Sequence, residues 1–126
     1  MARYEITVSA SAECALRIVG AKPEDSKQHG RTLFISATFA GEKLNETGYL
    51  ADERALRAAL AETVGQLDHQ YLNDLPQFQE QNPTAENIAR WLAEQLAGLA
   101  ARADISLAAV GVRLHRDAEV VYRPRG

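Results

Sequence analysis

The fold is decided by residues 32–67, TLFISATFAGEKLNETGYLADERALRAALAETVGQL, because the hydrophobic period changes within them. Residues 32–39 are rich in β-branched and aromatic side chains and are followed by Gly41, which predicts a β-strand. From Asp52 onward, apolar residues recur at helical spacing and Asp52 is a suitable N-cap, so we expect a helix to about Gln66. A strand and a helix therefore follow one another across a short loop.

The flanking sequence extends this pattern in both directions. Residues 4–16 alternate at period two and predict a first strand, while Thr84 marks the start of a second helix with its apolar face over 88–99. Residues 105–114 and 119–123 predict two further strands. The order predicts an α+β fold, with an antiparallel four-stranded sheet and both helices on one face. The other face would be uncovered, which favours oligomerisation.

Length and composition indicate one domain over residues 1–126, because a chain 46% apolar of this size can bury a core of its own. A single cysteine forms no internal disulfide, so we expect a cytoplasmic protein. The 14 Lys and Arg are scattered among 17 Asp and Glu, which disfavours nucleic acid as a partner. Residues 1–5 do not lead into an apolar signal core, and no uncharged stretch is long enough to span a membrane.

The densest group of reactive side chains lies in residues 67–73, LDHQYLN. Adjacent side chains on an extended segment point apart, so Asp68 and His69 need not touch. If a carboxylate orients the ring, His69 is suited to proton transfer near neutral pH. The alternative is a loop histidine near a helix C-terminus. The spacing of the three histidines and Cys14 does not by itself predict a zinc site.

Residues 67–73, followed by 82–89 (NPTAENIA) and Trp91, resemble the central signature of the 6-pyruvoyl-tetrahydropterin synthase and 6-carboxytetrahydropterin synthase family. The similarity extends to residues 47–52 before the first helix and to 110–122 over the last two strands. This resemblance implies the tunnelling fold, in which β-β-α-α-β-β subunits join their sheets into a barrel, usually as a trimer and then a hexamer. It also implies pterin sites between subunits and a zinc ion on three histidines.

The zinc positions of the family are altered in this chain. By resemblance, the first zinc histidine falls at Cys14, and the His-Gly-His motif reads His29-Gly30-Arg31. An arginine guanidinium stays protonated in a protein and repels a divalent metal. We therefore expect no zinc. If a zinc ion does bind, its ligands are Cys14 and His29, joined by Glu13 or Asp25.

The resemblance also locates the base and the pterin anchor. Asp25, or Glu24 with a one-residue shift, stands where the family has its catalytic cysteine, and a carboxylate there needs a raised pKa to act as a base. The anchoring glutamate falls at Leu114, so Glu119 could replace it only with a changed hairpin register. These assignments make Asp25, Asp68 and His69 the catalytic candidates, and Arg31, Thr84, Glu86, His115 and Glu119 the ligand-binding candidates. Thr84 and Glu86 suit helix capping equally well.

Three hypotheses follow. The first is a divergent member that binds a pterin-like or purine-like heterocycle between subunits without the usual zinc-dependent reaction. The second is an active carbon–oxygen lyase on dihydroneopterin triphosphate, with Arg31 replacing the ion electrostatically. The third is an oligomeric scaffold without a ligand, since a fold alone does not determine function.

Overall fold

One sheet of order β3-β1-β2-β4-β5 organises the chain in the computed structural model, which describes residues 2–125. Its long antiparallel strands are β1 (Tyr4–Leu16), β2 (His29–Gly41), β4 (Ser106–His115) and β5 (Ala118–Tyr122). The α+β class is confirmed. The sheet also contains a two-residue strand, β3 (Gln70–Tyr71), which runs parallel to β1 and is too short to give a sequence period.

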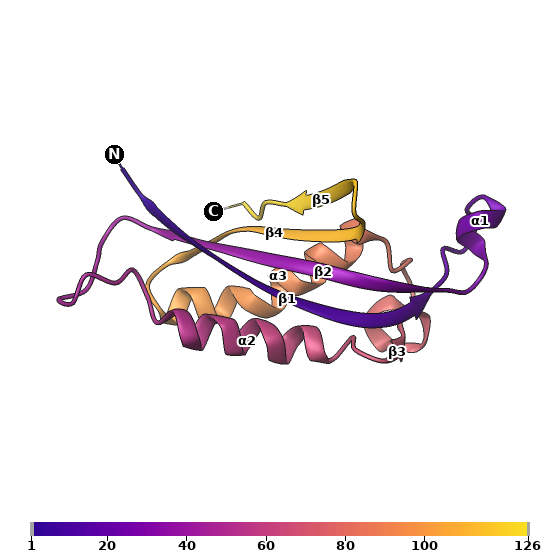
Figure 1. Cartoon of the computed structure of the whole chain (residues 1–126), viewed down its shortest axis with the longest axis horizontal. Coiled ribbons are helices and arrows are strands. Elements are labelled where there is room, and N and C mark those ends of the chain that lie inside the picture. Colours follow the sequence, from indigo (N-terminus) through magenta and orange to yellow (C-terminus); the bar gives the residue numbers. More distant parts are fainter. Residues whose placement is uncertain (1, 126) are drawn as a thin grey trace.

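The two main helices, α2 (Glu53–Gly65) and α3 (Ala85–Arg102), lie across the same face of the sheet (Figure 1). Asp52 caps α2 by accepting hydrogen bonds from the amides of Arg54 and Ala55, as expected from the sequence. The connections contain a short helix, α1 (Pro23–Ser26), and two 3₁₀ turns, η1 (Leu72–Asp74) and η2 (Pro76–Phe78). Figure 1 shows α1 at the tip of the β1–β2 hairpin, far from the N-terminus.

The strands alternate between a helix-covered face and an open face. Even-numbered residues of β1 from Val8 to Leu16 and odd-numbered residues of β2 from Leu33 to Phe39 pack towards the helices. They meet an apolar stripe on each helix, which includes Leu60 of α2 and Leu92 of α3. This contiguous apolar cluster is the core of the domain.

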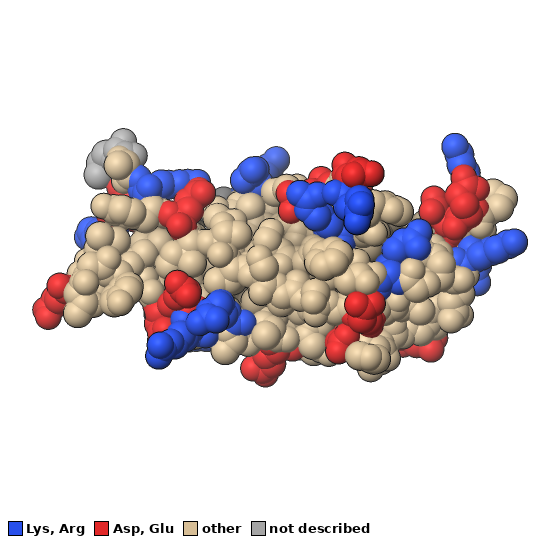
Figure 2. All heavy atoms as spheres, viewed as in Figure 1, with Lys and Arg blue, Asp and Glu red and all other residues tan. Residues whose placement is uncertain are grey.

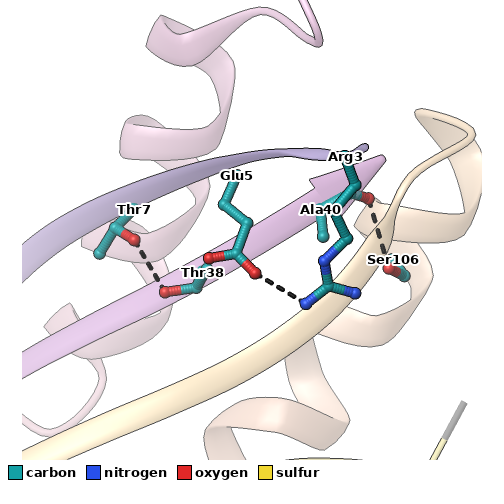
Figure 3. A network of polar contacts seen from close by, with 6 residues as sticks. All are labelled: Arg3, Glu5, Thr7, Thr38, Ala40 and Ser106. Carbon is teal, nitrogen blue, oxygen red and sulfur yellow. Dashed lines mark hydrogen bonds and ion pairs between the residues drawn. The ribbon is translucent and has the colours of Figure 1, made fainter. Parts of the chain in front are cut away.

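The open face carries many small hydroxyl side chains. On it the hydroxyls of Thr7 and Thr38 bond across β1 and β2 at 2.8 Å, and an Arg3–Glu5 ion pair lies beside them (Figure 3). In the view of Figure 2, positive and negative side chains are interspersed around an uncharged central area. Within residues 2–125, no helix combines the length and apolar character needed to cross a membrane.

Candidate functional site

The Asp68–His69 segment is bound to the outer edge of β1. Leu67 is fully buried after the end of α2, so the chain is anchored just before the pair. Asp68 Oδ1 accepts a hydrogen bond from the Glu13 amide at 2.9 Å, and the His69 amide donates to the Glu13 carbonyl at 2.6 Å. The β3–β1 pairing then begins at Gln70. Both groups of the pair are therefore positioned by backbone contacts to one residue.

The two side chains of the pair do meet. His69 adopts a left-handed backbone conformation, with φ of 58°, and its Nδ1 lies 2.9 Å from Asp68 Oδ2. The imidazole is 81% exposed and pairs with Asp68. With Nδ1–H donated to the carboxylate, Nε2 is the nitrogen left to accept or deliver a proton. This arrangement is chemically suited to general acid–base catalysis.

The pKa of Asp68 is held below its ordinary value of 3.8, first by the hydrogen bond from the Glu13 amide and then by the one from His69. The depressed pKa means that Asp68 stabilises the fold above pH 3.8, and that this contribution is lost as the pH falls through the native value. Asp68→Asn keeps an acceptor for Glu13 but cannot titrate. We expect it to be less stable than the wild type at neutral pH, with the gap narrowing as the pH falls below about 4. Urea titrations across this range measure the gap, and a constant gap would contradict the assignment.

The altered zinc positions lie together on the helix-facing side of the β1–β2 hairpin. Cys14 pairs directly with Arg31, and Leu16 pairs with His29, so the three resemblance-derived positions occupy neighbouring sites on one face. Cys14 is 8% exposed, and its pKa is raised to about 11, mainly by burial and further by the charges of Glu13 and Asp68. A pKa raised in this way disfavours the thiolate, which is the form of cysteine that zinc binds.

The other groups at this end do not complete a metal site. The Nδ1 of His29 lies 2.7 Å from the Lys27 carbonyl, and the guanidinium of Arg31 donates to the Gly30 carbonyl at 3.0 Å. Glu13 faces the open side of the sheet, where its carboxylate accepts from the Thr32 hydroxyl at 2.9 Å. Across residues 2–125, no group of three His, Cys, Asp or Glu side chains is arranged to hold a metal ion. The residues present therefore do not fit a tetrahedral zinc.

Asp25 and Glu24 lie on the exposed helix α1. This helix is tied to the end of β1, because the Asp25 carbonyl accepts from the Ile18 amide at 2.8 Å. Among the contacts of the described chain, none joins the Asp25 carboxylate to Asp68 or His69. A catalytic role for Asp25 stays a prediction.

The ligand-binding candidates are dispersed. Thr84 is the N-cap of α3 and accepts from the Asn87 amide at 3.1 Å, while Glu86 is exposed in the first turn of that helix. His115 is exposed at the end of β4. Glu119 lies on the open face, with its carboxylate 3.9 Å from Arg113 Nε. The structure thus places Asp68 and His69 together beside Glu13 of β1. It places Arg31 on β2, opposite Cys14 of β1, and places the other candidates elsewhere.

Two asparagines that received no functional assignment from the sequence, Asn73 and Asn82, hold the loop after β3 against the segment that follows β1. Asn73 accepts from the Arg17 amide and donates to the Arg17 carbonyl, both at 2.9 Å. Asn82 makes the same pair of bonds to Val19, at 2.9 and 3.0 Å. Each amide acts as a strand partner for one residue of the chain after β1. Both lie in the stretches that resemble the family signature, residues 67–73 and 82–89, but the residue types alone do not specify this role.

Asn73→Ala removes two hydrogen bonds to the backbone and is expected to cost about 1–3 kcal/mol of unfolding free energy. Asp74→Ala is the matched control, since Asp74 is the next residue and its side chain is exposed. Chemical denaturation at one protein concentration compares the two. Equal stability of the two variants would contradict the bridging role of Asn73.

The sequence profile of the family described as 6-pyruvoyl tetrahydropterin synthase matches residues 5–125. A curated relative, the dihydroneopterin monophosphate aldolase of Pyrococcus furiosus, is 35% identical over 68 residues; the match spans 54% of each chain, about half the relative's length.

Solved structures share the fold at low identity. The 6-pyruvoyl tetrahydropterin synthase of Caenorhabditis elegans has a TM-score of 0.82 at 19% identity, with 99% of this chain and 98% of that chain covered. The Plasmodium vivax synthase, solved as a variant with a catalytic glutamate replaced by alanine, has a TM-score of 0.77 at 16% identity, covering 98% and 99%. The family profile covers nearly the whole chain, and the solved structures share its fold. This chain therefore belongs to the 6-pyruvoyl tetrahydropterin synthase family.

Proposed function

We propose that this protein binds a pterin-like or purine-like heterocycle between copies of the chain, without the zinc-dependent reaction of its family. The observation that carries the proposal is the direct pairing of Arg31 with Cys14, which puts a permanent cation beside a buried thiol at two inherited metal positions. A guanidinium repels a divalent ion but donates strongly to carbonyl, carboxylate or phosphate oxygens. The site therefore keeps a positive charge, while only one of the three inherited histidines, His29, remains.

The Asp68–His69 pair supports retention of a ligand. Its ring is exposed, is not part of the buried apolar cluster, and is nevertheless oriented by the hydrogen bond that its Nδ1–H donates to the Asp68 carboxylate. Folding gains little from an exposed pair of this kind. Orientation of an exposed imidazole is what proton transfer to a bound molecule requires.

A site between copies is supported by the sheet edges. Beyond the two-residue contact with β3, the outer edge of β1 has no strand partner in the described chain, and the outer edge of β5 has none either. Unpaired edges are surfaces on which another strand can add. We infer a homo-oligomer, a trimer or a hexamer, in which these edges pair.

The binding proposal is tested by isothermal titration of the purified oligomer with neopterin, biopterin and guanine. We expect heat with at least one of them, competition among those that bind, and weaker binding in Arg31→Gln. Absence of both heat and competition would contradict the proposal and favour a scaffold without a ligand.

A second candidate function is catalysis on a dihydroneopterin-type substrate, a phosphate ester such as dihydroneopterin triphosphate. It is favoured by the 2.9 Å contact between Asp68 and His69. The Pyrococcus furiosus relative is named as an aldolase of dihydroneopterin monophosphate, which is also a dihydroneopterin phosphate. Here His69 Nε2 would move the proton, Asp68 would hold the ring, and Asp25 would be the candidate base.

For this candidate, His69→Ala is expected to lower turnover about 100-fold, since general acid–base groups contribute at least this much. Chromatography of the products measures the turnover, with and without a chelator. Gln70→Ala is the control, because Gln70 is exposed and contacts β1 through its backbone. Turnover that a chelator abolishes, or that survives the loss of His69, would contradict the assignment.

A further inference from the structure

The segment that carries the Asp68–His69 pair is attached to the sheet by a very short strand. Residues 66–84 connect α2 to α3, and within them only Gln70 and Tyr71 pair with β1, as strand β3 (Figure 1). A two-residue ladder specifies its register weakly, because little is lost when it slips. The left-handed backbone of His69 is also uncommon for a residue other than glycine and persists only when its surroundings hold it. The position of the pair therefore depends on further contacts.

Three side chains supply these contacts at regular intervals along β1 and the residues after it. Each uses an oxygen atom to accept from a backbone amide, in the order Asp68 from Glu13, Asn73 from Arg17 and Asn82 from Val19. In an extended chain, the backbone groups of alternate residues point to the same edge. The intervening Ile18 amide points the other way and donates to the Asp25 carbonyl of α1. The three contacts therefore follow the edge on which β3 pairs.

The two asparagine amides distinguish this register from its neighbours. Each amide satisfies both backbone groups of one residue, with four hydrogen bonds of 2.9–3.0 Å in all. A slip of one residue would bring these amides to backbone groups that point to the opposite edge, and a slip of two would separate Asn73 from Arg17. Either slip would break the hydrogen bonds of both amides at once. The asparagines therefore favour the register that puts Asp68 beside Glu13.

The segment transmits this register to the pair because it is held from within. Gln79 Nε2 donates to the Asn73 carbonyl at 2.9 Å, and Asn87 Nδ2 of α3 donates to the Asn82 carbonyl at 2.8 Å. Only residues 70–72 separate Asn73 from the pair, and the last of them is fully buried. A displacement of Asn73 along β1 would therefore also displace the pair.

We propose that Asn73 and Asn82 are positioning residues for the Asp68–His69 pair. By fixing the register of the segment on β1, they hold His69 in its left-handed conformation and keep its Nδ1 within hydrogen-bond distance of Asp68. They act through the backbone and not on a bound molecule. What the pair does to a ligand rests on the proposed function, whereas the contacts that position the pair do not.

The structural test compares Asn73→Ala and Asn82→Ala by NMR. One readout is hydrogen exchange of the His69 amide, which donates to the Glu13 carbonyl. We expect it to accelerate about tenfold more than exchange of the Leu60 amide in α2, because loss of the bonds loosens the segment locally. The second readout is the ¹⁵N shifts of the His69 ring, which identify the protonated nitrogen. The preference for the Nδ1–H form should fall in both variants.

Leu96→Ala is the control for a purely structural role. Leu96 is buried in α3, so its truncation lowers the stability of the whole domain. We expect it to accelerate the exchange of the His69 and Leu60 amides alike and to leave the protonated nitrogen of His69 unchanged. Local changes in Leu96→Ala as large as those in the asparagine variants would show that they arise from general instability and would overturn the inference.

Isothermal titration with neopterin connects positioning to ligand binding. Both asparagine variants should bind neopterin about fivefold more weakly than the wild type, because a loosened site must be ordered again on binding. Asp74→Ala should bind it as the wild type does, since its side chain is exposed in the same segment.

The outcomes separate this inference from the function on which it rests. Unchanged exchange and ring protonation of His69 in both asparagine variants would overturn the inference, even if the wild type binds neopterin. Changed His69 signals without neopterin binding to the wild type would support the positioning role and contradict the proposed function. If Asn73→Ala does not fold, the same readouts in Asn82→Ala decide between these outcomes.

Discussion

Phe39→Ala is expected to lower the free energy of unfolding by about 3–5 kcal/mol, the range for removing a buried aromatic side chain. Phe39 is fully buried in β2, between its partners Ile6 and Leu107, where the sheet meets the helices. Removing the ring leaves a cavity that the strands on both sides cannot close. Urea denaturation at a fixed protein concentration measures the loss, and an unchanged slope shows that the folded state is retained.

The matched control for this prediction is Phe34→Ala, the same substitution five residues earlier on the same strand. Phe34 faces the opposite side of the sheet and is 53% exposed, so its removal should cost much less stability. Equal losses in the two variants would contradict the division of the sheet into a core face and an open face.

The second large effect is a gain of metal binding. Because Cys14 and Arg31 are direct partners and His29 lies two residues along the same face of β2, Cys14→His combined with Arg31→His should bring three imidazoles together. We expect zinc to stabilise this double variant by about 2.7 kcal/mol at a free concentration 100 times its dissociation constant. The wild type should gain nothing under the same conditions.

Thermal unfolding with and without zinc measures this effect, and each variant serves as its own reference. Cys14→His combined with Arg31→Gln is the control, because it offers only two imidazoles. Equal stabilisation of the wild type by zinc, or none in the double variant, would show that these positions do not form the inherited metal site.

The main architecture was predictable from sequence because the long elements have strong periods. Residues 32–39 are rich in β-branched and aromatic side chains, whereas apolar residues recur at helical spacing after Asp52. The sequence therefore predicts the change from strand to helix. Strand β3 and helix α1 are two and four residues long, and such short elements show no period. Strand β3 depends on pairing with β1, and α1 on a hydrogen bond to Ile18 just after β1, and these contacts form only in the folded chain.

The site was less predictable because it depends on backbone geometry. The contact between Asp68 and His69 requires the left-handed conformation of His69, which sequence alone does not specify. The position of Glu119 requires the register shift in the β4–β5 hairpin. The residues at the altered zinc positions could be named from the resemblance, but the raised pKa of Cys14 follows from burial.

The most direct test of the central claim is the zinc content of the protein, measured by elemental mass spectrometry after purification without a histidine tag. With Arg31 opposite Cys14, we predict far less than one zinc ion per chain, unchanged in His29→Ala. One zinc ion per chain, lost when His29 is replaced, would contradict the account and restore metal-dependent chemistry at this site.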